Sequence, residues 1–249
     1  MYNARIVPIS YHSRRYSAQQ MYHLTKSVLV LLALLSARSR AEQSCKPPDT
    51  LLRNDSTVIT HYECYPNGRL RVADQLVNGQ LHGVSKSWHE NGQLAREERF
   101  VQGKTHGPRQ GWHPDGELAV RKPFAHGTPV DTHKVWWDNG NLKKLTVFDS
   151  SGRNDGPKVT WQEDGTTIDS TFYVDGKYVS EHLYWPNGKL KSYTLRGEPG
   201  KIKEATFHNP KGKLVAEIKD GEGEAVDFRD DGKIVGWYDV RGGKLIRRR

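Results

Sequence analysis

The chain has 249 residues, of which 35% are hydrophobic and 27% charged, as is normal for a soluble protein. Its 24 glycines and 10% aromatic residues favour short strands joined by tight turns, and so an all-β fold. The formal net charge is +9, but residues 1–41 supply six of these charges and the arginines at 247–249 supply the other three. A nucleic-acid groove needs basic residues clustered on the folded body, so this distribution argues against nucleic-acid binding.

Residues 1–41 have the features of a secretory signal peptide. Lys26 is followed by an apolar run over residues 27–35, and small residues precede a cleavage point after Ala41. The run is too short for a transmembrane helix, which needs ~20 apolar residues; a short buried helix is the alternative. Met21 begins a leader of ordinary length and is a second candidate for the true start. We therefore expect an exported protein, periplasmic or extracellular.

Both cysteines, Cys45 and Cys64, follow the predicted cleavage point. An even number of cysteines in an exported chain usually forms disulfides, and two free thiols are the alternative. The loop would hold about twenty residues, for which the chain-entropy model gives about 3 kcal/mol of stabilisation. We predict that residues 42–56 form an N-terminal cap, which the disulfide ties over the open edge of the sheet that follows.

A turn glycine recurs with spacings of 24, 24, 24, 25, 23, 24 and 20 residues. A second glycine recurs half a repeat later, so each repeat has two turns and room for two strands. In the first six turns Asn or Asp precedes the glycine, in three of them after a Pro, as in a three-residue hairpin with a bulge in which Gly supplies the positive φ. The turn glycines are Gly68, Gly92, Gly116, Gly140, Gly165, Gly188, Gly212 and Gly232.

Three columns of apolar residues keep the phase of this turn. The residue four before the glycine is aromatic and should pair across the hairpin with the leucine two after it. Counting in twos from the leucine reaches a phenylalanine, so all three columns are predicted to share one face. The columns are Trp88, Trp112, Trp136, Trp161 and Tyr184; Leu94, Leu118, Leu142 and Leu190; and Phe100, Phe124, Phe148 and Phe172. We predict an all-β, elongated antiparallel β-meander of about eight 24-residue hairpins over residues 57–240, followed by a basic tail over residues 241–249.

The units resemble the MORN-variant repeat, whose bacterial members are often labelled YwqK-type antitoxins. The resemblance rests on stretches such as Val84-Ser-Lys-Ser-Trp-His-Glu-Asn-Gly-Gln-Leu94 and Phe100-Val-Gln-Gly-Lys-Thr-His-Gly107. It implies a long β-meander used for contact with proteins or membranes, and the antitoxin label implies that a partner toxin is neutralised. It implies no catalytic residues. An export leader does not fit a cytosolic antitoxin, but it fits an immunity protein of the cell envelope.

Motifs of catalysis or metal binding are not found. Histidines recur at equivalent positions of neighbouring units, such as His89 and His113, but positions two strands apart are about 9 to 10 Å from each other. Zinc ligands must meet at about 2.1 Å from one ion. No G-x-S-x-G, H-E-x-x-H or P-loop sequence occurs, and the cysteine spacing matches no zinc motif. We predict a protein that is not an enzyme and has no cofactor or metal.

Aromatic residues directly after the first column are the candidates for partner binding. Trp137 and Trp185 hold this position, which other units fill with Tyr65, His89 and His113. Aromatic side chains are enriched at the centres of protein interfaces; the alternative is that a loop or the curl of the sheet covers them. The leading hypothesis is an exported immunity protein or antitoxin that binds a toxin encoded by a neighbouring gene. The rival hypothesis is a structural or adhesive module that contacts membrane head groups, glycans or peptidoglycan.

Overall fold

The computed structural model describes residue 45 and residues 49–53, 56–197 and 200–247. The chain divides into two compact units, residues 1–44 and residues 45–249, and every described residue belongs to the second. The predicted signal peptide, Met21 and residues 248–249 lie outside the described residues. The described ranges contain strands and turns but no helix, and so no helix that could cross a membrane.

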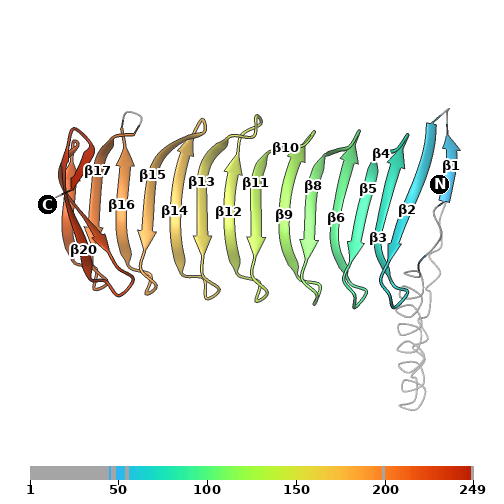
Figure 1. Cartoon of the computed structure of the whole chain (residues 1–249), viewed down its shortest axis with the longest axis horizontal. Coiled ribbons are helices and arrows are strands. Elements are labelled where there is room, and N and C mark those ends of the chain that lie inside the picture. Colours follow the sequence, from blue (N-terminus) through green and yellow to red (C-terminus); the bar gives the residue numbers. More distant parts are fainter. Residues whose placement is uncertain (1–44, 46–48, 54–55, 198–199, 248–249) are drawn as a thin grey trace, which may run out of the picture. The chain divides into compact units, whose positions relative to one another are not determined.

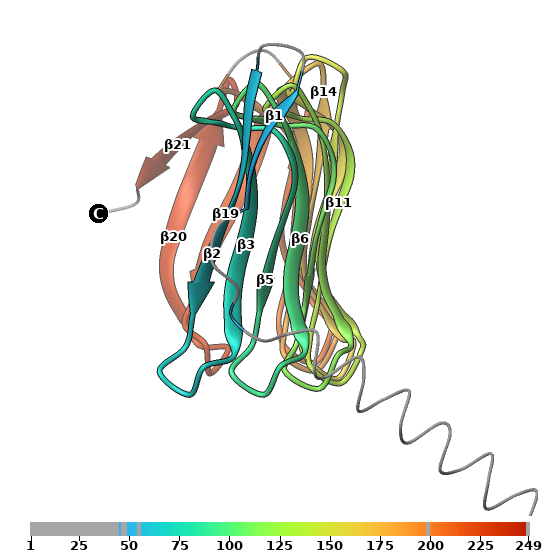
Figure 2. The same cartoon turned by 90° about the vertical axis from the view of Figure 1, so that its right-hand side faces the viewer.

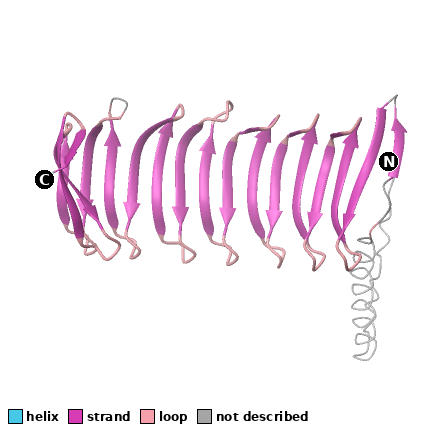
Figure 3. Cartoon of the chain, in the orientation of Figure 1, coloured by secondary structure: helices cyan, strands magenta, loops and turns pink. Residues whose placement is uncertain are grey.

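Most described residues belong to one antiparallel sheet of 21 strands, in which successive passes of the chain lie side by side (Figures 1 and 3). This confirms the predicted all-β meander. In three places one residue interrupts a single pass of the chain through the sheet, so that this pass counts as two strands. The interruptions are His82 between β4 and β5, His106 between β7 and β8, and Val130 between β10 and β11. The strands are β1 (Asp49–Arg53), β2 (Ser56–Cys64), β3 (Leu70–Val77), β4 (Gln80–Leu81), β5 (Gly83–Trp88), β6 (Leu94–Val101), β7 (Lys104–Thr105), β8 (Gly107–Trp112), β9 (Leu118–Ala125), β10 (Thr128–Pro129), β11 (Asp131–Trp136), β12 (Leu142–Phe148), β13 (Asn154–Trp161), β14 (Thr167–Val174), β15 (Lys177–Tyr184), β16 (Leu190–Arg196), β17 (Ile202–His208), β18 (Leu214–Lys219), β19 (Glu222–Phe228), β20 (Ile234–Arg241) and β21 (Lys244–Arg247).

The turns at the lower side of the sheet in Figure 1 are the predicted hairpins. In the turn between β5 and β6, the Gly92 N–H donates to the carbonyl of His89 at 2.8 Å, and Gly92 has a φ of 92°. The Asn91 Oδ1 accepts a hydrogen bond from the N–H of Gln93 at 3.0 Å, which explains why Asn or Asp precedes the glycine. The same backbone hydrogen bond closes all eight turns that contain the repeating glycines.

A bulge after each of these turns changes which side chains share a face. Trp88 pairs with Leu94, but Ser87 pairs with Arg96, so the returning strand contains one extra residue. Side chains alternate along a strand, and Phe100 pairs with Gly83, so Trp88 and Phe100 lie on opposite faces. The prediction that the Trp, Leu and Phe columns share one face was therefore wrong, because counting in twos took no account of the bulge.

Phe172 does not belong to the phenylalanine column. Tyr173 pairs with Gly156 just as Phe100 pairs with Gly83, so Tyr173 is the equivalent residue and Phe172 lies on the opposite face. The reason is the 25-residue spacing between the turn glycines at 140 and 165. A count of 24 residues from Phe148 stops one residue short of the equivalent position.

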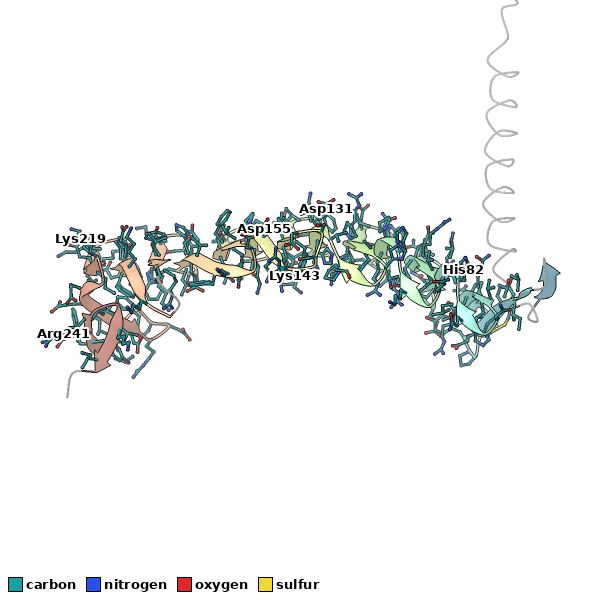
Figure 4. The ribbon with its side chains drawn as sticks, turned by 90° about the horizontal axis from the view of Figure 1, so that it is seen from above. His82, Asp131, Lys143, Asp155, Lys219 and Arg241 are labelled. Carbon is teal, nitrogen blue, oxygen red and sulfur yellow. A yellow bond between two sulfur atoms is a disulfide. The ribbon has the colours of Figure 1, made fainter. Side chains whose placement is uncertain are left out.

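The C-terminal strands curl toward one face of the sheet (Figures 2 and 4). The N–H of Ile202 in β17 donates to the carbonyl of Gly243, in the turn between β20 and β21, at 3.0 Å. The bend needs Gly223, whose φ is 145° and where a Cβ would fall on the carbonyl oxygen of Glu217. The face inside the curl is called the inner face and the opposite one the outer face. The buried cluster of the inner face contains Ile202, Ala205, Ile218, Ala225 and Val240.

At the N-terminal end, Cys45 and Cys64 form the disulfide that the sequence predicts, with their Cα atoms 5.8 Å apart. Strand β1, inside the predicted cap, pairs with β2 and forms the edge of the sheet. At the other end, residues 244–247 of the predicted tail form β21, which pairs with β20. A disulfide is compatible with an oxidising location such as the cell envelope.

Candidate functional site

The predicted partner-binding residues occupy one position, the first residue of each lower turn, and most of them bind the backbone of the next unit. The indole Nε1 of Trp137 donates to the carbonyl of Trp161 at 3.2 Å, and Tyr65 Oη donates to the carbonyl of Trp88 at 2.8 Å. Because the acceptors lie 23 or 24 residues further on, these bonds join consecutive hairpins. The same contact is made by His89 to Trp112 at 2.8 Å and by Trp185 to His208 at 2.9 Å.

Trp185 is covered, which is the alternative given by the sequence. Its side chain is 2% exposed and meets the Phe228 ring edge-on, with the ring centroids 5.4 Å apart. Phe228 ends β19, so the C-terminal curl brings it there. Trp137 is half-buried, with the Lys143 Nζ 3.9 Å from the centroid of its ring. A contact of these tryptophans with a partner stays a prediction.

His113 departs from the other members of this position. Its Nδ1 lies 2.9 Å from a carboxylate oxygen of Asp138, and its buried Nε2 has no hydrogen-bond partner among the described residues. His113 therefore makes no hydrogen bond to the next unit through its Nε2, whereas His89 does. The predicted roles of His89, His113 and Tyr65 in partner binding stay predictions.

The histidines of the upper turns also join neighbouring units. The Nδ1 of His82 accepts from the N–H of Gln102 at 3.5 Å, and the Nδ1 of His106 accepts from the N–H of His126 at 3.4 Å. Among the residues that the structure describes, no three His, Cys, Asp or Glu side chains gather as metal ligands would.

The centre of the inner face is a row of polar side chains that runs across the strands. Glu98 is 1% exposed and is bound by Arg96 and by the Nε of Arg109, the latter at 2.6 Å. His133, three strands further along, is 9% exposed and lies within hydrogen-bond distance, 2.9 Å, of the carbonyl of Pro123. Burial lowers the pKa of His133, more than that hydrogen bond raises it. His133 is therefore neutral at neutral pH.

On the outer face, an apolar cluster lies over β12 to β16. Phe172 and Val174 are each 44% exposed, and Pro157, which pairs with Phe172, is exposed beside them. Exposed apolar patches of this kind mark surfaces that bind other molecules. The cluster contains Leu145, Val147, Pro157, Val159, Phe172, Val174 and Leu195.

Comparison with known protein families finds a match for one hairpin of the sheet. Residues 81–102 match the MORN repeat variant. The match begins at the end of β4 and spans β5, the lower turn and β6, which is one complete hairpin. MORN repeat proteins are generally binding modules, and the match does not single out the antitoxin-type members. None of the curated proteins compared with the chain matches it.

The MORN-variant hairpin at residues 81–102 differs from the later units in its outer side chains. The residue seven after the turn glycine is Arg99 in this hairpin and Phe172 in the unit of Gly165. The turn residues and the Trp–Leu pair maintain the fold, so the positions between them are free to vary in chemistry. The exposed cluster around Phe172 was missed from the sequence, although the 25-residue spacing was the signal for it.

Charge is also segregated along the array. Strands β8 to β13 contain seven Lys and Arg residues and only two acids, Asp131 and Asp155, both at the beginning of a strand. Strands β17 to β20 contain three basic and six acidic residues. The body of the sheet is neutral in sum but has a basic middle and an acidic C-terminal end. The basic residues of the middle are Arg109, Arg121, Lys122, Lys134, Lys143, Lys144 and Lys158.

Proposed function

We propose that the chain is an exported binding scaffold that holds a protein partner on the outer face of β12 to β16. In its most specific form, the proposal is an immunity protein that binds and neutralises a toxin of the cell envelope. The observation that carries it is the exposed apolar cluster around Phe172 and Val174, each 44% exposed. A few side chains at the centre of an interface supply most of its binding energy, and aromatic residues are enriched there.

The architecture supports binding. Over most of its length the sheet is a single layer, so both faces meet solvent and outer side chains are available along many strands (Figure 4). The bonds between neighbouring units hold these strands in fixed register, so a partner would meet a surface that is already ordered. Preorganised surfaces bind with less loss of conformational entropy.

Export rests on the leader predicted for residues 1–41, and the disulfide Cys45–Cys64 is consistent with it. Because an exported protein cannot guard the cytosol, export favours an immunity protein of the cell envelope over a cytosolic antitoxin. The partner would then be a toxin that acts outside the cytosol.

The test is co-expression of the full chain with the product of the neighbouring gene. We expect the two proteins to co-purify and the chain to relieve the toxicity of its neighbour. Absence of both results would reject the immunity role. Sedimentation of the chain with peptidoglycan or liposomes, without binding to the neighbouring product, would favour the structural or adhesive module.

A further inference from the structure

Three lysines of the inner face, Lys122, Lys144 and Lys158, have no opposite charge to bind. Lys122 pairs across the strands with Arg109, Lys144 with Val135, and Lys158 with Thr146. Within the described part of the chain, none of the three lysines makes an ion pair or a hydrogen bond. Lys144 is exposed, and the other two are half-buried.

The register places two of these lysines on one line across the sheet. Lys134 pairs with Arg121, so the neighbouring His133 lies opposite Lys122; His133 pairs with Thr146, and Thr146 with Lys158. Lys122 and Lys158 are thus three strand spacings, about 14 Å, apart. Lys144 lies two residues from Thr146, on the same face.

No described side chain forms an ion pair with these three lysines. The guanidinium of Arg109, next to Lys122, is held by Glu98. Asp131 lies two residues from His133 on the inner face, and Asp169 in β14 and Glu181 in β15 lie on the same face, but none of these carboxylates makes an ion pair with the three lysines. Lys122 lies directly opposite Arg109, and like charges in this arrangement destabilise a sheet, so an anion bound here would relieve the repulsion. His133 adds no positive charge, since burial first and the charges of Lys122 and Arg109 after it lower its pKa.

We propose that the inner face of β9 to β13 binds an acidic, extended polypeptide segment, whose carboxylates neutralise Lys122, Lys144 and Lys158. In an extended chain, side chains four residues apart point the same way and lie about 13 to 14 Å from each other. Two carboxylates at this spacing match Lys122 and Lys158. The proposal concerns a different face and a different chemistry from the apolar cluster around Phe172.

The surroundings favour a polypeptide over a membrane. Phe124 and Phe148 border the lysines toward the upper turns, where their rings contact His133 at centroid distances of 5.3 and 4.6 Å. Apolar side chains of a bound segment would contact these rings. The C-terminal strands bend toward the inner face, so a flat bilayer would meet them before it reached the lysines (Figure 4).

The test is the affinity of the full chain for a synthetic peptide of alternating Glu and Thr, with Gln replacing Glu in a control peptide. The variant Lys122→Gln/Lys158→Gln removes two charges from the inner face. Its control, Arg121→Gln/Lys134→Gln, removes two charges from the outer face of β9 and β11, within the same part of the sheet. We expect about ten-fold weaker binding for the inner variant and less than about two-fold change for the outer one. Equal weakening, or no binding of the unaltered chain at low salt, would overturn the proposal.

A second measurement needs no substitution. Carbodiimide joins a bound carboxylate directly to the lysine that it contacts, and we expect the peptide to be joined to Lys122, Lys144 and Lys158. Cross-links mainly at Lys86 and Lys134 of the outer face would overturn the proposal, as would displacement of the peptide by anionic vesicles that require the same lysines. Phe172→Ser should leave peptide binding unchanged, which separates this site from the proposed toxin-binding surface.

Discussion

Strands β5, β8, β11 and β13 each have a single residue of positive φ near their beginning, where the strand bends. Gly83, Gly107 and Gly156 have φ values of 93°, 85° and 119° at equivalent positions of their units. Asp131 holds the same position with a φ of 58°. The aromatic residues opposite, such as Phe124 on Gly107 and Phe148 on Asp131, cover this part of the inner face.

Replacing Gly107 with Ala tests the backbone alone, because a Cβ there would have no atom within 4 Å. We expect Gly107→Ala to lower the free energy of unfolding by about 1 to 2 kcal/mol, since L-residues resist positive φ. Gly111→Ala in the same strand is the control, because Gly111 has no positive φ and its nearest contact would be 3.5 Å away. Urea denaturation measures both variants, and equal losses would contradict the explanation.

The buried His133 should make stability depend on pH. Because its pKa is lower in the folded protein, the unfolded chain binds the proton first when pH falls. The stability contributed by neutral His133 is complete above the unfolded pKa of about 6.5 and is lost as pH falls toward the lower folded pKa. We expect the unaltered chain to lose more stability than His133→Gln between about pH 7.5 and about pH 5.5 in thermal melts. Parallel losses would show that other groups cause the effect.

At the scale of elements, the hairpins are coupled by side chains that reach the backbone of the next unit. Trp137 and Gln162 hold the same position, but the Trp137 bond to Trp161 measures 3.2 Å and the Gln162 bond to Pro186 measures 3.5 Å. The longer contact is the weaker one, so the position is not equally important in every unit.

We expect Trp137→Phe to loosen the contact between the lower turns that follow β11 and β13, because the carbonyl of Trp161 loses its hydrogen-bond donor. The loss should be about 1 kcal/mol, read as faster amide hydrogen exchange in the turns that join β11 to β12 and β13 to β14. Gln162→Met serves as the control and should change exchange little. Faster exchange throughout the sheet would argue against a local coupling.

Turns and strand pairing were predictable from the sequence because their signals are local. Asn or Asp and then Gly specify seven of the eight lower turns, Lys211 preceding Gly212 in the other, and the turn sets which residues pair. A bulge at the turn glycine was predicted, but the extra residue beyond it, Ala95, was not, since it has no distinctive type and only the pairing of Ser87 with Arg96 reveals it. The faces of the phenylalanines were therefore assigned wrongly. Phe228 covers Trp185 because the C-terminal strands curl at Gly223. This contact joins distant strands, and no local pattern of the sequence encodes it.

At the scale of the whole molecule, the array has no single core. Units contact mainly their neighbours, as in other repeat proteins, so a local disturbance should stay local. The described apolar core is confined to the C-terminal strands around Ile218 and Val240.

Reduction of the Cys45–Cys64 disulfide tests this locality. Because the disulfide joins residue 45 to the end of β2, we expect its reduction to speed hydrogen exchange in β1 and β2 and to leave β12 to β16 unchanged. Cys45→Ser/Cys64→Ser should show the same pattern without a reductant. Cooperative unfolding of the whole sheet on reduction would contradict a locally coupled array.

The distribution of chemistry over the array agrees with a scaffold that has separate binding surfaces. The outer face is apolar over β12 to β16, and the inner face is basic over β9 to β13. The same kinds of turn and bulge occur in all these strands, and they fix the positions of the two surfaces relative to each other.

The central claim is that a protein partner binds the outer face at Phe172. The affinity of the full chain for the product of the neighbouring gene, measured for Phe172→Ser and Arg99→Ser, tests it most directly. Both substitutions fall at the seventh residue after a turn glycine, so the two residues occupy equivalent positions in different repeat units. We predict that Phe172→Ser weakens binding about thirty-fold or more, as at an interface hot spot, and that Arg99→Ser changes it less than about two-fold. Unchanged affinity of Phe172→Ser, or an equal loss in both variants, would contradict the claim.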